Sequence, residues 1–412
     1  MFNYIDTTLH CEGVPLADIA KKTGTPAYVY SSAEILGNYR AYDEAFGNLP
    51  HMVCYSVKAN SSLGILALLA KAGCGFDIVS SGELFRVLQV GGDPKKVIFS
   101  GVGKTASEVE YALCKGIHSF NCESEAELAL IDALAGRMGI RAEFSIRANP
   151  DVDASTHPYI ATGLQDHKFG VDISEVEGVY NRARSLSNIV ATGVSCHIGS
   201  QLLDVDPMME AVDKILALIE RLRASGHAIR HVDFGGGLGV AYKAGDATPE
   251  IRAFIGKLAE KVRGRSLDVM VEPGRSIVGA AGALLTRVLY RKRTARKEFV
   301  IVDAAMNDLI RPALYQSHHE ILPLRKSDRA EIVADVVGPV CESGDFLARD
   351  RKVANAAPGD LLAVCTAGAY GFTLSSNYNS RTRPPEILVS GDRWRVIRAR
   401  ETFEDLIRGE LI

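Results

Sequence analysis

The feature that most constrains the fold is a series of eight short β-type segments between His51 and Arg275, most of which are followed by a helical pattern. The segments lie near residues 51–57, 75–79, 96–99, 118–121, 142–147, 191–197, 230–234 and 268–272. Strands that alternate with helices pair in parallel, and eight such units in roughly 225 residues fit a closed (β/α)8 barrel better than an open sheet. A doubly wound sheet remains the structural alternative.

Local signals predict where several of these helices begin. Capping boxes at Ser80–Glu83, Thr105–Glu108 and Ser124–Glu127 offer a side-chain oxygen and a carboxylate to the unpaired amides of a helix start. The pairs Asp206-Pro207 and Thr248-Pro249 place proline at the first helical position, where its missing N–H costs nothing. We therefore expect helices to begin at these five points.

After Arg275 the pattern changes to β-rich segments separated by turns, which predict a separate all-β domain. These segments cover residues 283–291, 299–303, 332–337, 360–365, 385–389 and 394–397. One more β-type stretch, Pro26 to Tyr30, precedes the first helix-like segment. We predict a barrel domain over 32–276 and a C-terminal β domain over 277–412, which is joined by the N-terminal segment 1–31.

Composition and charge exclude several classes of protein. Lys plus Arg total 47 against 50 for Asp plus Glu in 412 residues, and the net charge of -3 gives no broad basic surface for a nucleic acid. The amino terminus lacks the basic flank and apolar core of a secretory signal, and no apolar run approaches the length of a membrane-spanning helix. We expect a globular cytoplasmic protein that binds neither nucleic acid nor membrane.

The eight cysteines include no C-x-x-C pair, which argues against a zinc knuckle and a dithiol redox motif. We expect most of them to be reduced and buried, and we predict no metal site.

Four groups that suit one cofactor stand where the predicted strands end. Lys58 closes the first strand and can form an imine with an aldehyde, and His197 at the end of the sixth can stack on a ring. The glycines Gly235–Gly237 after the seventh strand can admit a phosphate, and Glu272 after the eighth can hold a pyridinium proton. Functional groups in a parallel barrel gather at the carboxyl ends of the strands, with phosphate commonly after strands seven and eight. Together these residues predict a pyridoxal phosphate site.

Each of these groups also has an ordinary structural explanation. A strand-end lysine is usually a solvated cation, and most glycine clusters are turns. Taken alone, His197 would be a hydrogen-bonded histidine at the barrel rim and Glu272 a surface residue before a turn. The loops Phe234–Gly239 and Glu272–Arg275 favour the cofactor, because bare amides and an arginine would converge on one anion.

Two other phosphate-binding interpretations fail on spacing. Ser100–Thr105 ends in Gly-Lys-Thr like a P-loop, but the required first glycine falls at Ile98 and no magnesium aspartate is evident. Dinucleotide binding needs G-x-G-x-x-G, and counting from Gly235 and Gly237 the third glycine position holds Val240.

At these residues, and over nearly its whole length, the chain resembles the fold-type III pyridoxal phosphate-dependent decarboxylases. Tyr55–Asn60 resembles the family's cofactor-lysine motif, Cys196–Gln201 its ring-stacking and phosphate segment, and Glu272–Arg275 its pyridine-nitrogen and substrate segment. The resemblance implies an alanine racemase-like barrel that binds pyridoxal 5′-phosphate through Lys58, His197, Ser200, Gly235, Gly236, Gly237, Glu272, Gly274, Arg275 and Tyr370.

Substrate choice in this family depends on other segments. They correspond to His157–Gly163, Met306–Tyr315, Cys341–Asp345 and Ser375–Arg381. The second and the last are similar to the members that convert meso-2,6-diaminopimelate to L-lysine and CO2, the last step of lysine biosynthesis. By that resemblance Arg275, Arg311 and Tyr315 hold the distal carboxylate, Glu342 holds the distal ammonium, and Tyr370 contacts the cofactor phosphate or the substrate.

The charges of that substrate agree with these residues. Its non-reacting end carries both an ammonium and a carboxylate, and two arginines can clamp a carboxylate in a bidentate way that lysine cannot. An enzyme for ornithine would need carboxylates there and no arginine pair. Alone, Arg311 would be an ordinary surface cation.

The resemblance implies that the substrate amine displaces Lys58, CO2 leaves, and a proton returns to the same carbon. It assigns that proton to Cys341, a thiol, which in relatives comes from the partner subunit. We therefore predict a homodimer with shared active sites. The alternatives are a decarboxylase for ornithine, arginine or lysine, an amino acid racemase on the same scaffold, or a non-catalytic cofactor-binding regulatory protein.

Overall fold

The computed structural model describes residues 2–152 and 168–412 of the chain. The segment His157–Gly163, which we predict to contribute to substrate choice, lies outside the described residues.

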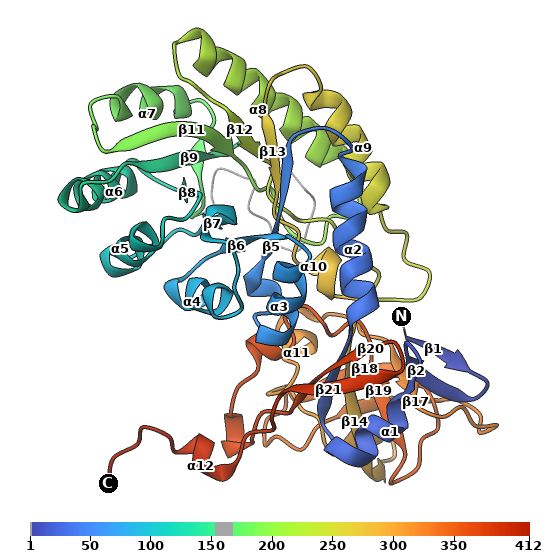
Figure 1. Ribbon diagram of the computed structural model, residues 1–412. Helices are drawn as coiled ribbons and strands as arrows, with labels where there is room; N and C mark the ends of the chain where they lie inside the picture. The colour runs from blue at the N-terminus through green and yellow to red at the C-terminus, as the bar shows by residue number, and fades with distance from the viewer. Residues whose placement is uncertain (1, 153–167) are drawn as a thin grey trace. The chain divides into compact units, whose positions relative to one another are not determined.

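The chain divides into two compact units, which Figure 1 shows. The barrel unit contains residues 37–240 and 248–276, and the β unit contains residues 1–36, 241–247 and 277–412. The helix α2 (Ser32–Ala45) begins in the β unit and ends in the barrel unit.

The barrel unit is a closed (β/α)8 barrel. Its strands are β5 (His51–Ser56), β6 (Gly75–Ile78), β7 (Val97–Phe99), β8 (Ser119–Cys122), β9 (Ala142–Asn149), β11 (Ile189–Ser195), β12 (His231–Asp233) and β13 (Asp268–Val271), with the short β10 (Val171–Asp172) beside β9. They pair in parallel in this order, and β13 pairs back with β5 to close the barrel. The predicted barrel is confirmed, and the open sheet is wrong.

A helix follows each barrel strand along the chain (Figure 1). These helices are α3 (Leu63–Lys71), α4 (Ser81–Gln89), α5 (Ala106–Lys115), α6 (Glu125–Met138), α7 (Val176–Ala183), α8 (Asp206–Ala224), α9 (Ile251–Val262) and α10 (Arg275–Val278). In the described parts of the chain, no helix has both the length and the apolar character needed to cross a bilayer.

The helix starts follow the capping prediction with local differences. Thr105 and Glu108 form a complete capping box at α5. Ser80 and Ser124 cap the amides three residues on, as predicted, but the carboxylates of Glu83 and Glu127 accept from the amide just before each cap residue.

The two proline predictions have different outcomes. Pro207 lies in the first turn of α8, as its second residue rather than its first. The prediction for Pro249 is wrong, because Glu250 is extended and α9 begins only at Ile251.

The barrel strands place large apolar side chains outward, beneath the helices. Phe76, Phe99, Phe120 and Phe144 lie on four successive strands and are at most 1% exposed. The residues that alternate with them face the opposite side of the sheet. Asn121 on β8 contacts Asp233 on β12, and because these strands are not neighbours the contact crosses the barrel interior. The barrel interior is therefore polar at the carboxyl ends of the strands.

The β unit contains two sheets. A small antiparallel sheet is formed by β1 (Phe2–Ile5), β2 (Thr8–Cys11) and β3 (Val14–Pro15), and the helix α1 (Leu16–Thr23) follows it. The larger sheet has the order β18-β17-β15-β14-β4-β20-β21, with β19 pairing β14 and β16 pairing β19. Its strands are β4 (Ala27–Ser31), β14 (Gly282–Arg293), β15 (Glu298–Val302), β16 (Ile321–Pro323), β17 (Ile332–Val337), β18 (Phe346–Val353), β19 (Leu361–Val364), β20 (Glu386–Ser390) and β21 (Arg393–Arg398).

The N-terminal strand β4 lies inside this larger sheet. It pairs antiparallel with β14 and parallel with β20, so the chain's beginning and its last third share one sheet. Two short helices also belong to the unit, α11 (Arg311–Tyr315) and α12 (Phe403–Leu406), and neither was predicted. All eight cysteines are free, and five of them are buried.

Candidate active site

Lys58 follows β5 in a single 3-10 turn, Val57–Ala59, at the carboxyl end of the strand. Its Nζ donates to Asp77 Oδ2 at 2.9 Å, and the Asp77 side chain is fully buried. Ser56 Oγ donates to the same oxygen at 2.8 Å. Asp77 therefore orients the amine, because a buried carboxylate holds a cation strongly.

Glu272 follows β13 and lies close to Asp233, at the end of β12. Burial and the neighbouring carboxylates of Asp233 and Asp77 raise the pKa of Glu272 well above its ordinary value. Burial also raises the pKa of Asp233. Two carboxyl groups that share one buried position cannot both ionise easily, so this pair holds a proton that ordinary carboxylates would have lost.

His197 lies after β11 and is half-buried. Its Nδ1 accepts from the Gly236 backbone N–H at 3.3 Å, and its backbone carbonyl accepts from Arg147 Nη2 at 3.3 Å. Burial together with the cations of Arg147 and Lys58 lowers the pKa of His197 well below its ordinary value. A neutral imidazole is the form that stacks on a cationic ring without repulsion.

The loop Gly235–Gly237 has no room for side chains. A Cβ on Gly236 would lie 2.1 Å from the backbone oxygen of Glu272. A Cβ on Gly237, whose φ is +118°, would lie 2.3 Å from the backbone oxygen of Gly199. These oxygens belong to the backbone and cannot rotate away as the end of a side chain could. Only glycine therefore fits at these positions at the edge of the barrel.

The segments Cys196–Gln201 and Glu272–Arg275 meet at this edge. Arg275 is buried, and its Nη2 donates to Ser200 Oγ at 3.1 Å. Gly274 packs against the end of β5 and the 3-10 turn after it, where an added Cβ would lie 3.0 Å from the Cβ atoms of Ser56 and Ala59. The structure thus brings together all the predicted cofactor residues that belong to the barrel unit.

This arrangement fits pyridoxal phosphate. A glycine loop without side chains, beside an arginine and a serine hydroxyl, suits a phosphate. In this structure the Gly235 N–H donates to Asp233 Oδ1 at 2.9 Å and the Gly236 N–H to His197 Nδ1 at 3.3 Å. The buried carboxyl pair suits a basic ring nitrogen, because it can share a proton with it. Lys58 supplies the amine that an aldehyde requires.

The other predicted residues belong to the β unit. Arg311 begins α11 and is 5% exposed, and its guanidinium lies 4.4 Å from the ring centroid of Tyr242. Its Nη1 donates to His319 Nε2 at 3.2 Å, while the Nδ1–H of His319 donates to the Cys365 carbonyl at 2.8 Å. These contacts hold Arg311 in place, so it is not the solvated surface cation of the alternative interpretation. Tyr315 ends the same helix and is half-buried.

The segments predicted to determine substrate choice contact each other in this unit. The Cys341 backbone N–H donates to Asn379 Oδ1 at 2.8 Å, which joins Cys341–Asp345 to Ser375–Arg381. The Met306 N–H donates to Asp345 Oδ1 at 2.7 Å, which joins Met306–Tyr315 to the same group. Three segments that are far apart in the sequence therefore form one structural cluster.

Within that unit Cys341 and Glu342 are exposed, whereas Tyr370 is half-buried. Tyr370 has φ +55°, a left-handed conformation that tyrosine seldom adopts. Backbone strain of this kind is often found at functional positions.

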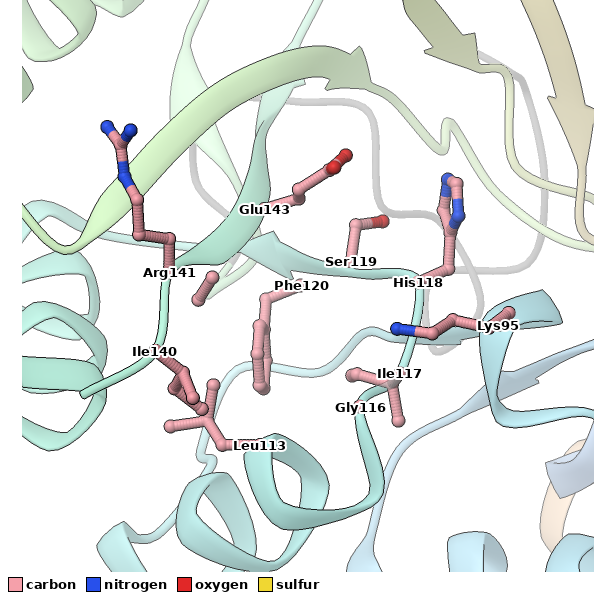
Figure 2. A pocket seen from close by; sticks show the side chains of 11 residues that line it. Lys95, Leu113, Gly116, Ile117, His118, Ser119, Phe120, Ile140, Arg141 and Glu143 are labelled. Carbon is pink, nitrogen blue, oxygen red and sulfur yellow. The ribbon is translucent and has the colours of Figure 1, made fainter. Parts of the chain in front are cut away.

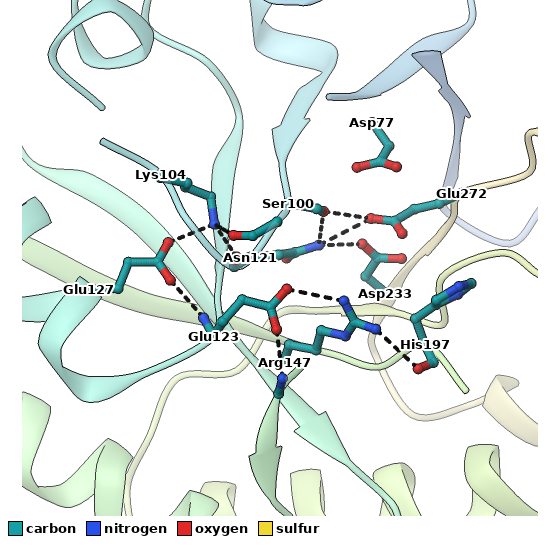
Figure 3. A network of polar contacts seen from close by, with 12 residues as sticks. Asp77, Ser100, Lys104, Asn121, Glu123, Glu127, Arg147, His197, Asp233 and Glu272 are labelled. Carbon is teal, nitrogen blue, oxygen red and sulfur yellow. Dashed lines mark hydrogen bonds and ion pairs between the residues drawn. The ribbon is translucent and has the colours of Figure 1, made fainter. Parts of the chain in front are cut away.

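Lys104, the lysine of the P-loop-like segment, has a structural role. Its side chain is 1% exposed. Its Nζ donates to Glu127 Oε1 at 2.6 Å and to the backbone oxygens of Asn121 and Gly101 at 2.7 and 2.8 Å (Figure 3). All three ammonium hydrogens are used, which leaves none for a nucleotide phosphate.

A cavity of about 360 Å³, whose lining residues Figure 2 shows, lies at the amino ends of β7, β8 and β9. Lys95 precedes β7, His118 precedes β8, and Glu143 is near the start of β9. None of the predicted site residues lines it. The carboxyl ends of the strands, rather than this cavity, carry the candidate active site.

The sequence interpretation did not include Asp77, Ser100, Asn121 and Asp233 among the site residues. Ser100, Asn121 and Asp233 lie at or next to the end of a predicted strand, and Asp77 lies in the middle of one. Each comes two residues after an inward-facing position, and this spacing is the signal that could have found them. Nothing in a single sequence shows which strand-end polar groups converge.

The comparisons with known proteins identify the class. Residues 32–279 match the family model described as "Pyridoxal-dependent decarboxylase, pyridoxal binding domain". The chain is 54% identical over 410 residues to the diaminopimelate decarboxylase of Pseudomonas aeruginosa, covering 99% of this chain and 98% of that one. It is 51% identical to that of Vibrio cholerae, with 98% and 97% covered.

Solved structures support the same family assignment. The diaminopimelate decarboxylase of Helicobacter pylori complexed with L-lysine is 43% identical, with a TM-score of 0.92 over 95% of this chain and 98% of that one. The chain therefore belongs to the pyridoxal-dependent decarboxylases and, within them, to the diaminopimelate decarboxylase family. Its cofactor is pyridoxal 5′-phosphate.

Proposed function

We propose that this protein decarboxylates meso-2,6-diaminopimelate to L-lysine and CO2, the last step of lysine biosynthesis. The bond between one α-carbon and its carboxylate breaks, CO2 leaves, and a proton takes its place on that carbon. The observation that carries the proposal is the likeness of the whole chain to diaminopimelate decarboxylases, at up to 54% identity among the relatives described above. A decarboxylase of the ornithine, arginine or lysine type is not favoured.

In this proposal the barrel residues hold the cofactor. The glycine loop of Gly235, Gly236 and Gly237 makes room for its phosphate, with Ser200, Gly274 and Arg275 beside it. When bound, pyridoxal phosphate supplies an aldehyde for amines and a pyridinium ring that accepts the electrons left by CO2. His197 would stack on that ring, and Glu272 would stabilise a proton at its nitrogen. Asp77 orients the Lys58 amine.

The β-unit residues select the substrate. Arg311 and Tyr315, with Arg275, bind the distal carboxylate, Glu342 binds the distal ammonium, and Tyr370 contacts the phosphate or the substrate. Cys341 delivers the proton to the α-carbon from the partner subunit of a cytoplasmic homodimer. The barrel domain is residues 32–276, and residues 1–31 complete the β domain of 277–412.

The decisive test is CO2 release from the purified protein with pyridoxal phosphate, measured in parallel with meso-diaminopimelate, ornithine, arginine and lysine. We expect release from meso-diaminopimelate alone. Preference for one of the others would replace the substrate assignment, and bound cofactor without release from any would favour the regulatory alternative.

Replacing Arg311 with leucine should raise the KM for meso-diaminopimelate by roughly tenfold to a hundredfold, because a charge-assisted hydrogen bond to the distal carboxylate is lost. The yellow colour of bound cofactor should persist. Arg393→Leu is the matched control, since the Arg393 side chain is 91% exposed. An unchanged KM, or loss of colour, would contradict the assigned role.

Removing the Cys341 thiol as Cys341→Ala should lower kcat by about a hundredfold, because the general acid is lost. Because each active site is proposed to combine residues of two subunits, mixing two inactive variants should restore activity. When this variant is mixed and reassociated with inactive Lys58→Ala, half of the dimers carry one intact site, so about a quarter of wild-type activity should return. Full activity of Cys341→Ala alone would make the thiol a bystander, and no recovery on mixing would exclude shared sites.

A further inference from the structure

Asn121 bridges the two carboxyl groups at the carboxyl end of the barrel interior. It lies on β8 and is 3% exposed. Its Nδ2 donates to Asp233 Oδ2 at 2.9 Å and to Glu272 Oε1 at 3.2 Å, as Figure 3 shows. One amide nitrogen carries two hydrogens, so it can serve both carboxyl groups at once.

Ser100 joins the same hydrogen-bonded group. Its Oγ accepts from Asn121 Nδ2 at 3.2 Å and donates to Glu272 Oε1 at 3.1 Å. The amide nitrogen of Asn121, rather than its oxygen, faces the two carboxyl groups. The Asn121 backbone is held from the other side, since Lys104 Nζ donates to its carbonyl at 2.7 Å. The bridging side chain therefore extends from a backbone position that is held within β8.

The charges around Glu272 show why such a bridge matters. Asp233 and Asp77 face it as further carboxyl groups and Lys58 as a cation, and burial and the two carboxyl groups together raise its pKa well above the ordinary value. Hydrogen bonds to the ionised form of an acid oppose that shift. Without the amide of Asn121, Glu272 would hold its proton more tightly and give it up less readily to a base placed against it.

We propose that Asn121 is a positioning residue that bridges the carboxyl groups of Asp233 and Glu272. With this bridge, the proton held by the two carboxyl groups rests on the ring nitrogen of bound pyridoxal phosphate rather than on Glu272. This inference rests on the proposed function, because the ring nitrogen must face Glu272. The transfer moves one proton from a carboxyl oxygen to a nitrogen and leaves both carboxylates ionised, each with a donor from Asn121.

The test compares Asn121→Leu and Asn121→Ala with the wild type. Neither replacement supplies a hydrogen-bond donor or adds a charge beside the two carboxyl groups. Thr192→Val is the matched control, because Thr192 is 1% exposed on β11 and its hydroxyl has no hydrogen-bond partner among the described residues. Thermal unfolding identifies the variants that fold.

The first readout is the 15N resonance of ring-labelled pyridoxal phosphate at saturating cofactor. We expect the pyridinium position in the wild type and Thr192→Val, and a shift toward neutral pyridine in both Asn121 variants, with cofactor binding about tenfold to a hundredfold weaker. The second readout needs no cofactor: infrared titration of the apoprotein should show a protonated carboxyl that persists to higher pH in Asn121→Leu than in the wild type.

The outcomes separate the two proposals. If the folded Asn121 variants bind the cofactor with an unchanged 15N resonance, the proposed role of Asn121 is wrong. If a variant does not retain the cofactor, an unchanged carboxyl titration of its apoprotein also shows that the role is wrong. A neutral ring nitrogen in the wild type overturns it as well. Failure of the wild type to bind pyridoxal phosphate or to release CO2 would instead refute the proposed function.

Discussion

Replacing Lys58 with alanine should lower decarboxylation by about 1,000-fold or more and abolish covalent attachment of the cofactor. The amine lies at the end of β5, 2.9 Å from the buried Asp77 Oδ2, and no other group in the proposed mechanism supplies a nucleophilic nitrogen at this position. Borohydride reduction of the wild type followed by peptide mass mapping should place the cofactor on Lys58, whereas the reduced variant should carry no label.

Lys58→Arg separates the chemistry of Lys58 from its charge. The guanidinium keeps a cation beside Asp77 but forms no stable adduct with an aldehyde. We therefore expect this variant to fold and to bind pyridoxal phosphate without covalent attachment and without activity. Labelling of a different lysine in the wild type, or activity in the arginine variant, would refute the assignment of Lys58.

Gly236→Ala should destabilise the barrel unit by about 1–3 kcal/mol or more and prevent retention of the cofactor. The new methyl group would lie 2.1 Å from the backbone oxygen of Glu272, so the glycine loop or the end of β13 must move. Either movement displaces an amide of the proposed phosphate site or the carboxylate of the proposed ring-nitrogen site. Chemical denaturation and equilibrium dialysis with pyridoxal phosphate measure the two effects separately.

Gly256→Ala is the matched control for this change. Gly256 lies in α9, and an added Cβ there would meet nothing within 4 Å. Alanine in a helix interior is favoured over glycine, so this variant should be more stable by about 0.5–1 kcal/mol with unchanged cofactor binding. A Gly236→Ala protein that matches the control in stability and binding would show that the loop is not a phosphate cradle.

The barrel could be predicted from the sequence because its physical signals are local. Strands buried on both sides appear as short apolar runs, and capping residues such as Thr105 mark the helices between them. All eight strands lie at the predicted places, and the residues predicted at their carboxyl ends do converge in the barrel unit.

The strands that could not be predicted from the sequence are short or polar. The strand β18 contains the run Arg349-Asp350-Arg351-Lys352, which is typical of the edge position that it occupies. The first sheet consists of strands of two to four residues, too short for an alternation to show. Pro249 resembles a helix start but precedes a residue that is still extended.

The polar network of the site could not be predicted from the sequence, for a different reason. Asp233 and Asn121 belong to strands that are not neighbours, so their contact depends on closure of the barrel. Local patterns do not contain that information. The buried position of Arg311 against Tyr242 likewise joins residues that are far apart in the sequence.

The central position of β4 has a consequence for synthesis on the ribosome. Among the strands of the larger sheet β4 is synthesised first, yet its partner β14 begins only at Gly282 and its partner β20 only at Glu386. At roughly 5–20 residues per second, translation leaves this apolar strand without its first partner, β14, for on the order of ten to fifty seconds, while the barrel can already be folding. During that interval β4 is an unpaired apolar strand, which is the kind of segment that chaperones protect.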